Sequence, residues 1–289
     1  MIVVVRLIGG LGNQLFQYAA GKSLSHKLRV PLKIDKSDFK RYKLHRYSLL
    51  HFNLTSDEAS KRELNLFPRR ASASRKRKLF SKFFNRGYPT FSQKNLNFDP
   101  SLFENKAPIY LDGYWQSEKY FKSIENIIRS EFTFKTKIDH LSKEILEKIL
   151  NCNSVSIHIR RGDYVNNSVT NAKHGTPSMD YYYRSIEIIH EKTSNPYFFI
   201  FSDDINWVKS NLIIDGNVTY VSHNDSLSNY QDLRLMSNCK NNIIANSSFS
   251  WWGAWLNANR KKIVLAPAKW FNEDYFNEND IVPNSWISI

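Results

Sequence analysis

Cysteine is nearly absent from this sequence. Only Cys152 and Cys239 occur among 289 residues, and no Cys-x-x-Cys spacing is present. A disulfide scaffold needs several cysteines and a structural zinc site needs closely spaced pairs, so neither class of protein fits. Two reduced, buried thiols are the simpler interpretation, and they suit a cytosolic protein.

Long hydrophobic runs are also lacking. No stretch approaches the roughly 18 apolar residues of a membrane-spanning helix. The run Ile2–Val5 is too short for the apolar part of a signal peptide, and no basic segment precedes it. We therefore expect a cytoplasmic protein, with peripheral contact at the inner face of the membrane as an open alternative.

Acidic residues are in short supply: 27 Asp and Glu face 41 Lys and Arg, which gives a net charge of +14. This balance favours anionic partners, namely nucleic acid, an acidic membrane surface or a phosphorylated substrate. The basic residues are dense between Ser56 and Lys94. A solvated basic face, contact with an anionic leaflet and contact with nucleic acid are the three interpretations of that stretch.

Apolar residues are plentiful, at 42% of the chain with 14% aromatic, so a sizeable core can form and a disordered chain is excluded. An apolar run over Ile2–Leu7 precedes a glycine turn and a helical pattern from Gln14 to about Leu28. A strand over Ser154–Ile159 and a helix over Met179–Glu191 restart the same alternation. Alternating strands and helices predict parallel sheets, and two such series predict two Rossmann-type lobes facing a cleft, at 1–150 and 151–289.

The first motif is the glycine turn Gly9-Gly10-Leu11-Gly12-Asn13-Gln14. Glycines between a strand and a helix let backbone N–H groups approach an anionic ligand. A dinucleotide fingerprint would use Gly10 and Gly12, with Asp35 about 20 residues on to hold a ribose. Leu15 occupies the place of the third glycine, so a tight turn without a ligand stays open.

The second motif, His158-Ile159-Arg160-Arg161-Gly162-Asp163-Tyr164, lies at the carboxyl end of a predicted strand. Ligands of open α/β sheets bind at that end, and the planar fork of arginine suits a diphosphate. One of Arg160 and Arg161 can face a ligand while the other pairs with Asp163. A salt-bridged surface turn is the alternative.

The third motif is Asn246-Ser247-Ser248-Phe249-Ser250-Trp251-Trp252-Gly253-Ala254-Trp255. Hydroxyl residues at a helix N-terminus can cap the helix and donate to phosphate oxygens, and the three serines are placed for both. We expect the tryptophans to be mostly buried in the core.

Together, the segments GGLGNQLFQYA, HIRRGDY and ANSSFSWWGAWL resemble glycosyltransferase family 11, the α-1,2-fucosyltransferases. Ser202-Asp203-Asp204 and Tyr230-Gln231-Asp232-Leu233 are similar to that family as well, so the resemblance covers residue 1 to about 270. It implies an α/β, GT-B-like fold with an N-terminal acceptor-side lobe and a C-terminal GDP-fucose-binding lobe.

The resemblance also implies a reaction. L-fucose would move from GDP-fucose to the 2-hydroxyl of a β-galactoside, with inversion, in the synthesis of an O-antigen-type surface polysaccharide. The partners would be GDP-fucose and a galactose-terminated glycan, with no nucleic acid and no cofactor. Because no Asp-x-Asp triplet is present, the usual signature of a metal clamp on the diphosphate is missing, and arginine and helix N-termini would replace it.

Individual roles follow from the same resemblance. Arg160 would bind the β-phosphate, with Arg161 beside it, and Asp232 would accept hydrogen bonds from guanine in a pocket lined by His158. The diphosphate of the donor would lie along Ser247, Ser248 and Phe249. In the first lobe, Asn13 would face the fucose beside the turn of Gly10 and Gly12.

The catalytic base is less clearly marked. Asp163 could act as the base or could orient one of the arginines, and His174 and Asp180 are weaker candidates.

Two other functions compete with the transferase. A nicotinamide-dependent oxidoreductase would use Gly10, Gly12 and Asp35, but it leaves the arginine and serine motifs without a role. A basic nucleic-acid-binding protein would account for the charge, but the sequence carries none of the usual recognition signatures.

Overall fold

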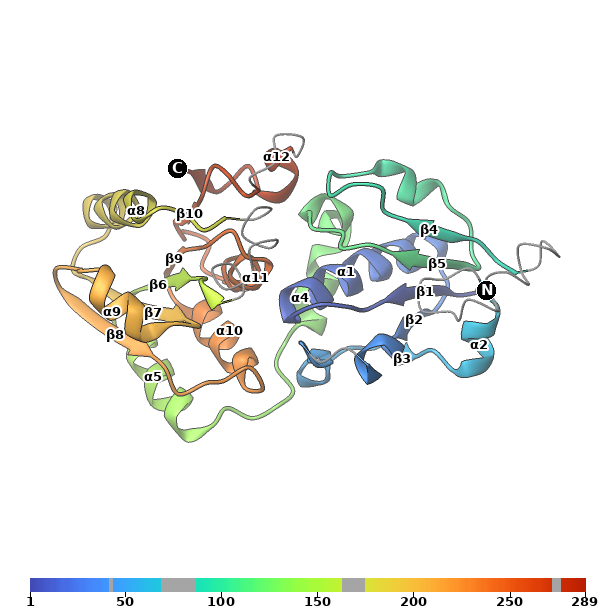
Figure 1. The fold of residues 1–289 in the computed structure, drawn as a ribbon, viewed down its shortest axis with the longest axis horizontal. Helices are drawn as coiled ribbons and strands as arrows, with labels where there is room; N and C mark the ends of the chain where they lie inside the picture. The colour runs from blue at the N-terminus through green and yellow to red at the C-terminus, as the bar shows by residue number, and fades with distance from the viewer. Residues whose placement is uncertain (42–43, 69–86, 163–174, 272–276) are drawn as a thin grey trace. The chain divides into compact units, whose positions relative to one another are not determined.

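The computed structural model describes residues 1–41, 44–68, 87–162, 175–271 and 277–289. These residues form two compact units, Met1–Lys135 and Thr136–Ile289, here called the N-terminal and C-terminal units. Each is built on a sheet of parallel strands accompanied by helices (Figure 1). The predicted α/β class with two Rossmann-type lobes is confirmed.

The N-terminal unit has a five-stranded sheet in the order β3-β2-β1-β5-β4. Its strands are β1 (Val3–Arg6), β2 (Leu32–Asp35), β3 (Asp57–Glu58), β4 (Thr90–Ser92) and β5 (Ile109–Asp112). Its helices are α1 (Leu11–Leu28), α2 (Lys61–Asn65), α4 (Glu125–Glu131) and the 3₁₀ turns η1 (Ser37–Lys40), η2 (Leu49–His51), η3 (Pro100–Glu104), η4 (Glu118–Tyr120) and η5 (Lys122–Ile124).

Strand β1 is the centre of this sheet, with Val5 opposite Ile34 of β2 and Leu111 of β5. Its valines are fully buried because both faces are covered, as expected of a β-branched run in a parallel sheet. Helix α1 packs against the sheet through Gly21, where a Cβ would lie 3.0 Å from side-chain atoms of Val5 and Leu32. The glycine lets the helix approach the strands closely.

The C-terminal unit has a six-stranded sheet in the order β11-β10-β9-β6-β7-β8. Its strands are β6 (Asn153–Ile159), β7 (Pro196–Ser202), β8 (Asn217–Val221), β9 (Asn241–Ile243), β10 (Val264–Ala266) and β11 (Ile287–Ser288). Its helices are α5 (His140–Leu150), α8 (Met179–Lys192), α9 (Ile205–Asn211), α10 (Asn229–Asn238), α11 (Ser248–Leu256) and α12 (Glu278–Ile281).

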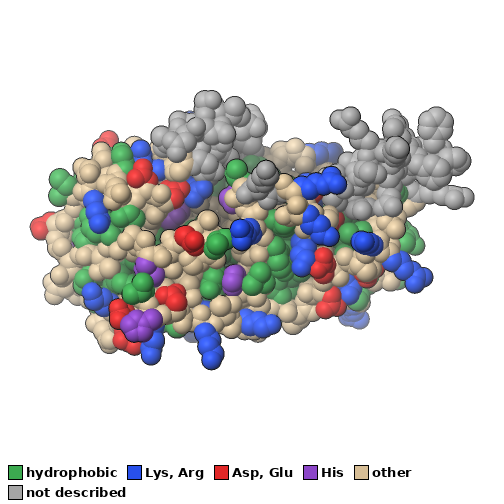
Figure 2. Space-filling view, turned by 60° about the horizontal axis from the view of Figure 1, so that its bottom comes forward, with side chains coloured by type: hydrophobic (Ala, Val, Ile, Leu, Met, Phe, Trp, Pro, Cys, Tyr) green, Lys and Arg blue, Asp and Glu red, His purple; other side chains and the backbone are tan. Residues whose placement is uncertain are grey.

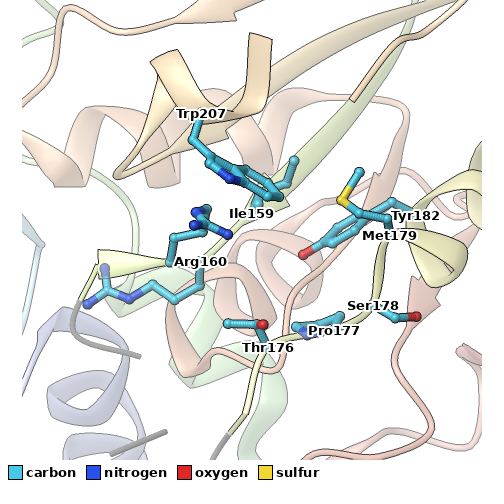
Figure 3. Close-up of a pocket in the computed structure, with 9 residues that line it drawn as sticks. Ile159, Arg160, Thr176, Pro177, Ser178, Met179, Tyr182 and Trp207 are labelled. Atoms are coloured by element: carbon cyan, nitrogen blue, oxygen red, sulfur yellow. The ribbon is translucent and has the colours of Figure 1, made fainter. Parts of the chain in front are cut away.

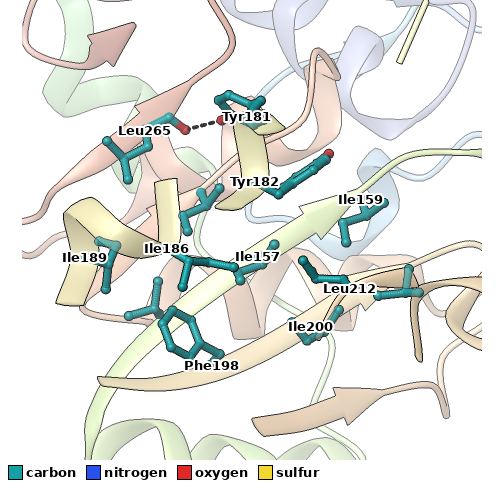
Figure 4. Packing of buried hydrophobic residues seen from close by; sticks show 13 residues of the cluster. Ile157, Ile159, Tyr181, Tyr182, Ile186, Ile189, Phe198, Ile200, Leu212 and Leu265 are labelled. Atoms are coloured by element: carbon teal, nitrogen blue, oxygen red, sulfur yellow. Dashed lines mark hydrogen bonds between the residues drawn. The ribbon is translucent and has the colours of Figure 1, made fainter. Parts of the chain in front are cut away.

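Strand β6 alternates between two environments. Val155, Ile157 and Ile159 join an apolar cluster with residues of α8, β7 and α9 (Figure 4). The Tyr181 hydroxyl of α8 donates to the backbone oxygens of Ile244 and Leu265, at 2.7 and 2.9 Å, which fixes the helix over the sheet. Because successive side chains of a strand point to opposite faces, His158 lies on the other face of β6.

The tryptophans of α11 are buried, as the sequence predicts. Trp251 and Trp255 stack with their ring centroids 6.2 Å apart, and Trp252 meets both rings edge-on. A Cβ on Gly253 would lie 3.0 Å from the Cβ of Met236, so this glycine allows α11 to approach α10.

The boundary between the units lies at Lys135, fifteen residues before the predicted boundary at 150. The intervening segment is bonded to the C-terminal unit: Gln231 donates to the backbone oxygen of Lys137 at 3.2 Å, and Arg234 donates to that of Thr136. Helix α5 also packs against α10. A helical pattern in the sequence does not reveal which sheet the helix covers.

Two smaller expectations need adjustment. Helix α1 begins at Leu11 rather than at Gln14, so Gly12 lies in its first turn and not in the preceding loop. Both cysteines are free, as predicted, but only Cys239 is buried, whereas Cys152 is partly exposed.

The basic stretch is only partly visible. Residues 69–86 hold eight basic and no acidic residues and lie outside the described part of the chain. On the face shown in Figure 2, the Lys and Arg side chains of the described residues are spread out with acidic side chains among them. Within the described ranges, no helix has both the length and the apolar content needed to cross a bilayer.

Candidate functional site

The candidate site of the C-terminal unit lies at the carboxyl edge of its sheet. All strand pairs in this sheet are parallel, so the loops that follow the strands meet at one edge, where ligands of such sheets bind. Arg160 and Arg161 follow β6, and Asp203 and Asp204 follow the neighbouring β7. The segment that leads to α11 follows β9 on the other side of β6.

The two arginines are held in different ways. Arg160 places Nη1 2.8 Å from Oδ2 of Asp203. Arg161 donates its backbone N–H to Oδ1 of Asp203 at 2.9 Å, and its guanidinium carbon lies 3.5 Å from the centre of the Trp207 ring. Its Nε is 3.4 Å from Oδ2 of Asp204. The carboxylate of Asp203, directly after β7, therefore contacts both residues of the arginine pair.

Gly162 is part of the same arrangement. A Cβ at this position would lie 2.5 Å from Oδ2 of Asp203, the oxygen that also binds Arg160. Any side chain here would displace that carboxylate. The glycine of the Arg-Arg-Gly sequence therefore leaves room for the carboxylate that contacts both arginines.

A cavity of about 220 Å³ opens beside the arginines (Figure 3). The indole of Trp207 lies on one side of it, and Thr176, Pro177 and Ser178 lie on the opposite side. Its remaining lining residues are Ile159, Arg160, Arg161, Met179 and Tyr182. Because pockets for drug-sized ligands measure roughly 300–1,000 Å³, this cavity can hold only a part of a nucleotide sugar.

His158 is buried next to the arginines, with 5% of its surface exposed. Its ring centroid is 5.6 Å from that of Phe249, and its Nδ1 has no hydrogen-bond partner among the described residues. Burial lowers the pKa of His158 to about 4; the charge of Asp203 opposes this shift and that of Arg160 adds to it. The imidazole is therefore neutral near pH 7.

The N-terminus of α11 carries the serine motif. Ser247 caps the helix, accepting the N–H of Phe249 on its hydroxyl at 3.3 Å, as predicted. Ser250 was expected to share in phosphate binding, but it is buried and its hydroxyl donates back to the oxygen of Ser247 at 3.3 Å. The other two serines of the motif, Ser247 and Ser248, lie at the N-terminal end of the helix.

Asp232 lies in the first turn of α10 and is partly buried. Asn224, which follows β8, donates its Nδ2 to Oδ1 of Asp232 at 2.6 Å. Burial raises the pKa of Asp232 to about 7 and the negative charge of Asp139 adds to the shift, while the hydrogen bond from Asn224 opposes it. A carboxyl group that titrates near neutrality is typical of functional sites.

In the N-terminal unit, the glycine motif forms a turn tied together by amides. Gly9 has a φ of +84° and Gly10 is the N-cap of α1. Gln14 donates to the backbone oxygens of Gly9 and Arg46, at 2.9 and 2.8 Å. Asn13 accepts a hydrogen bond from Nε2 of Gln116 at 2.7 Å on its Oδ1.

The dinucleotide interpretation of this turn is contradicted. Asp35 is 2% exposed, and its two carboxylate oxygens accept hydrogen bonds from the Tyr110 hydroxyl and the Ser37 N–H, at 2.8 and 2.9 Å. It is a structural group and cannot reach a ribose. Gly12, the second glycine of the fingerprint, belongs to the helix.

Of the three candidates for a catalytic base, only Asp180 lies within the described residues. Asp163 and His174 lie outside the described residues. Asp180 is exposed in the first turn of α8 and does not line the cavity, although Met179 beside it does. Sequence reasoning gave no separate role to Asp203, Trp207 or Asn224. The position of Asp203 directly after a predicted strand could have indicated that it lies at the same sheet edge as the arginines.

Two bacterial relatives match this chain over nearly its whole length. The Escherichia coli alpha-1,2-colitosyltransferase is 39% identical over 298 residues, covering 100% of this chain and 99% of the relative. The Escherichia coli O-antigen biosynthesis glycosyltransferase WbnK is 32% identical over 302 residues, covering 98% and 99%. Galactoside alpha-(1,2)-fucosyltransferase 1 of Leontocebus fuscicollis is 25% identical over 154 residues, covering 50% of this chain and 42% of that protein.

Solved structures of low sequence identity share the fold. NodZ alpha-1,6-fucosyltransferase soaked with GDP-fucose has a TM-score of 0.54 at 14% identity, covering 88% of this chain and 92% of that one. A mutant of Arabidopsis thaliana FUT1 in complex with GDP has a TM-score of 0.57 at 12% identity, covering 92% and 70%. The fold is thus the GT-B type of these fucosyltransferases. The sequence model of glycosyl transferase family 11 matches residues 2–289, and with the two full-length bacterial relatives it shows that the chain belongs to glycosyl transferase family 11.

Proposed function

We propose that the protein is an inverting, metal-independent fucosyltransferase. It moves L-fucose from GDP-fucose to the 2-hydroxyl of a β-galactoside, in the synthesis of an O-antigen-type surface polysaccharide. The observation that carries the proposal is the pair Arg160 and Arg161, oriented by Asp203 beside a cavity at the carboxyl edge of the sheet. The names of the relatives support a 6-deoxysugar transferase of this kind.

The arginine pair suits a diphosphate leaving group. A guanidinium carries five N–H donors, so the ion pair of Arg160 with Asp203 is compatible with bidentate binding of a phosphate. Negative charge grows on the β-phosphate as the bond to fucose lengthens, and a fixed cation there stabilises the transition state more than the substrate. Ser247 and Ser248, at the N-terminus of α11, add N–H and O–H donors for the same diphosphate.

Guanine would be recognised by Asp232. Its carboxylate can accept the two adjacent N–H groups of the Watson–Crick edge of guanine, which adenine lacks. His158, buried and neutral against Phe249, would line the same nucleotide site. That GDP or GDP-fucose is bound in the NodZ and FUT1 structures supports a guanine nucleotide as the donor part.

The remaining proposed roles concern the transferred sugar and the absence of a metal. GDP-fucose is β-linked and an α-linked product requires inversion, for which Asp163 is the proposed base. Asn13 with Gly10 is the proposed fucose contact in the N-terminal unit, while Gly12, inside α1, would act only by allowing the helix to start. Absence of a metal requirement rests on the missing Asp-x-Asp triplet and on the arginine pair.

A second donor sugar is favoured by one comparison. The relative with 39% identity is named a colitosyltransferase. Colitose is fucose without its 3-hydroxyl, so an enzyme for either sugar needs the same nucleotide site and differs only in a contact to one hydroxyl group.

A transfer assay tests the proposal. The purified chain is incubated with β-galactosides and either GDP-fucose or GDP-colitose, with and without excess EDTA, and GDP release and product linkage are measured. We expect faster turnover with GDP-fucose, an α-1,2 product, and activity that survives EDTA. Preference for GDP-colitose would reassign the donor, and activity lost in EDTA but restored by Mn²⁺ or Mg²⁺ would contradict the metal-independent mechanism. No transfer from either donor would reject the function.

Contact with an anionic membrane and a cytoplasmic location stay predictions. Membrane contact depends on the basic stretch between Ser56 and Lys94, of which residues 69–86 lie outside the described ranges, and the cytoplasmic expectation depends on the lack of a long apolar run.

A further inference from the structure

The N-terminal unit has its own carboxyl edge, and the segment that follows β5 displays an unusual arrangement there. This segment reads Asp112-Gly113-Tyr114-Trp115-Gln116. Trp115 is 0% exposed, whereas its neighbour Tyr114 is 39% exposed. The larger aromatic ring anchors the loop in the core and the smaller, hydroxylated ring is presented to solvent.

The loop is held in a strained conformation. Trp115 has a φ of +56°, the left-handed region that costs a non-glycine residue on the order of 1–2 kcal/mol. Gln93 stabilises it by accepting the N–H groups of Tyr114 and Trp115 on Oε1, at 2.8 and 3.1 Å. The indole stacks on Phe91 and meets Tyr120 edge-on, with centroids 5.9 and 5.5 Å away. Strain that is over-determined in this way is concentrated at ligand sites.

Gly113 is part of the same loop. A Cβ on it would lie 2.5 Å from Cβ of Gln93 and 2.8 Å from Cε2 of Trp115. The glycine therefore lets the chain pass between the residue that holds the loop and the ring that anchors it. Tyr114 follows directly, so its outward position is built into the loop.

Polar side chains on either side tie the loop to the rest of the edge. Gln116 donates to Asn13 in the first turn of α1 at 2.7 Å. Asp112 binds Nη1 of Arg6 at 2.8 Å, and Arg6 also binds Asp38 through Nε at 2.6 Å. The charge of Arg6 is thus matched by two carboxylates. An edge of this kind suits an uncharged, hydroxyl-rich ligand better than a phosphate.

We propose that Tyr114 is an acceptor-binding residue on which the galactose ring of the glycan stacks. This inference rests on the proposed function. The axial 4-hydroxyl of galactose leaves the C–H groups of carbons 3, 4 and 5 on one face of the ring, and such an apolar face packs on an aromatic ring whose hydroxyl remains in water. The amide of Gln116, next to Tyr114 along the chain, then hydrogen-bonds a hydroxyl group at the rim of the sugar.

The test measures acceptor and nucleotide separately. Tyr114→Ala should raise the KM for a β-galactoside about two- to twelvefold, which is the conversion of the roughly 0.5–1.5 kcal/mol that a stacked ring contributes. The kcat, the affinity for GDP and the hydrolysis of GDP-fucose without acceptor should change little. Tyr114→Phe, which keeps the ring, should stay near the wild-type KM. Tyr183→Ala is the matched control, because Tyr183 of α8 is 37% exposed but lies in the C-terminal unit.

Direct binding of methyl β-galactoside in the presence of GDP, followed by saturation-transfer NMR, separates this inference from the proposed function. If the wild type transfers sugar but Tyr114→Ala keeps the wild-type KM, the acceptor role of Tyr114 is overturned while the function stands. If no variant transfers sugar, the binding measurement still decides: galactoside binding lost in Tyr114→Ala and kept in Tyr183→Ala supports the inference, and equal binding overturns it. A parallel loss of GDP affinity in Tyr114→Ala would also overturn it.

Discussion

The two carboxyl edges of this protein have similar architecture, and both pair their arginines with carboxylates, but they differ in how their other ionisable groups titrate. In the N-terminal unit the charged groups neutralise one another: Arg6 lies between Asp38 and Asp112, and Asp35 is buried under two hydrogen bonds. In the C-terminal unit the pKa of His158 is lowered to about 4 and that of Asp232 is raised to about 7. A parallel sheet edge offers a place for a ligand, but the side chains decide whether a charged ligand can be recognised there.

The largest expected effect on turnover comes from substitutions of Arg160, in the C-terminal unit. Arg160→Ala should lower turnover about 10²–10³-fold, because a fixed donor to the developing phosphate charge is lost. Arg160→Lys should rescue poorly, since a single ammonium cannot reproduce the two-pronged geometry. Steady-state kinetics on folded variants, checked by circular dichroism, measure the effect.

Arg161→Ala is the comparison variant, because the Arg161 guanidinium is engaged by stacking on Trp207 and by pairing with Asp204. Its loss should mainly lower the melting temperature. A dead Arg161→Ala beside an active Arg160→Ala would exchange the two roles, and full activity in both variants would reject the phosphate clamp.

A smaller effect concerns the pH dependence of nucleotide binding. Guanine requires the ionised form of Asp232, whose pKa of about 7 makes this form scarce at pH 6 and abundant at pH 8. GDP affinity should therefore rise about tenfold between pH 6 and pH 8, with proton release on binding. Calorimetry in buffers of different ionisation enthalpy measures both.

The raised pKa of Asp232 also makes the free energy of unfolding depend on pH. Because the folded state binds this proton more tightly than the unfolded state, the contribution of Asp232 to the unfolding free energy falls as the pH rises from 3.8 to about 7. Asp232→Asn should flatten the pH dependence of GDP binding, and Asp232→Ala should lose selectivity for GDP over ADP. Unchanged selectivity in Asp232→Ala would show that another group reads the base.

The smallest effect on nucleotide binding is expected for Arg6, at the carboxyl edge of the N-terminal unit. Arg6→Ala leaves two half-buried carboxylates without their cation, so it should lower the unfolding free energy by about 1–3 kcal/mol. GDP affinity should not change, because the nucleotide groups belong to the C-terminal unit. Urea denaturation and a GDP titration on the same sample decide the matter, and weaker GDP binding would break the contrast between the two edges.

The sequence predicts local features of the site well. The strand that ends at Ile159, the capping role of Ser247 and the burial of Trp251 all follow from short-range patterns. The burial of Asp35 does not, because its partner Tyr110 lies 75 residues away, on a strand whose neighbours cannot be identified from one sequence. The Asn224 contact to Asp232 was missed for a similar reason: it joins the loop after β8 to α10, and the loop sequence does not show which element it contacts.

The Asp203 carboxylate has a practical consequence for protein engineering. It joins the Arg160 side chain, the Arg161 backbone and the space left by Gly162 into one assembly. A short peptide with the same letters, transplanted into another scaffold, would therefore carry the arginines without their orientation. A transplanted module has to include residue 203 on the neighbouring strand's loop, and design libraries that vary residues 160–162 need to vary residue 203 with them.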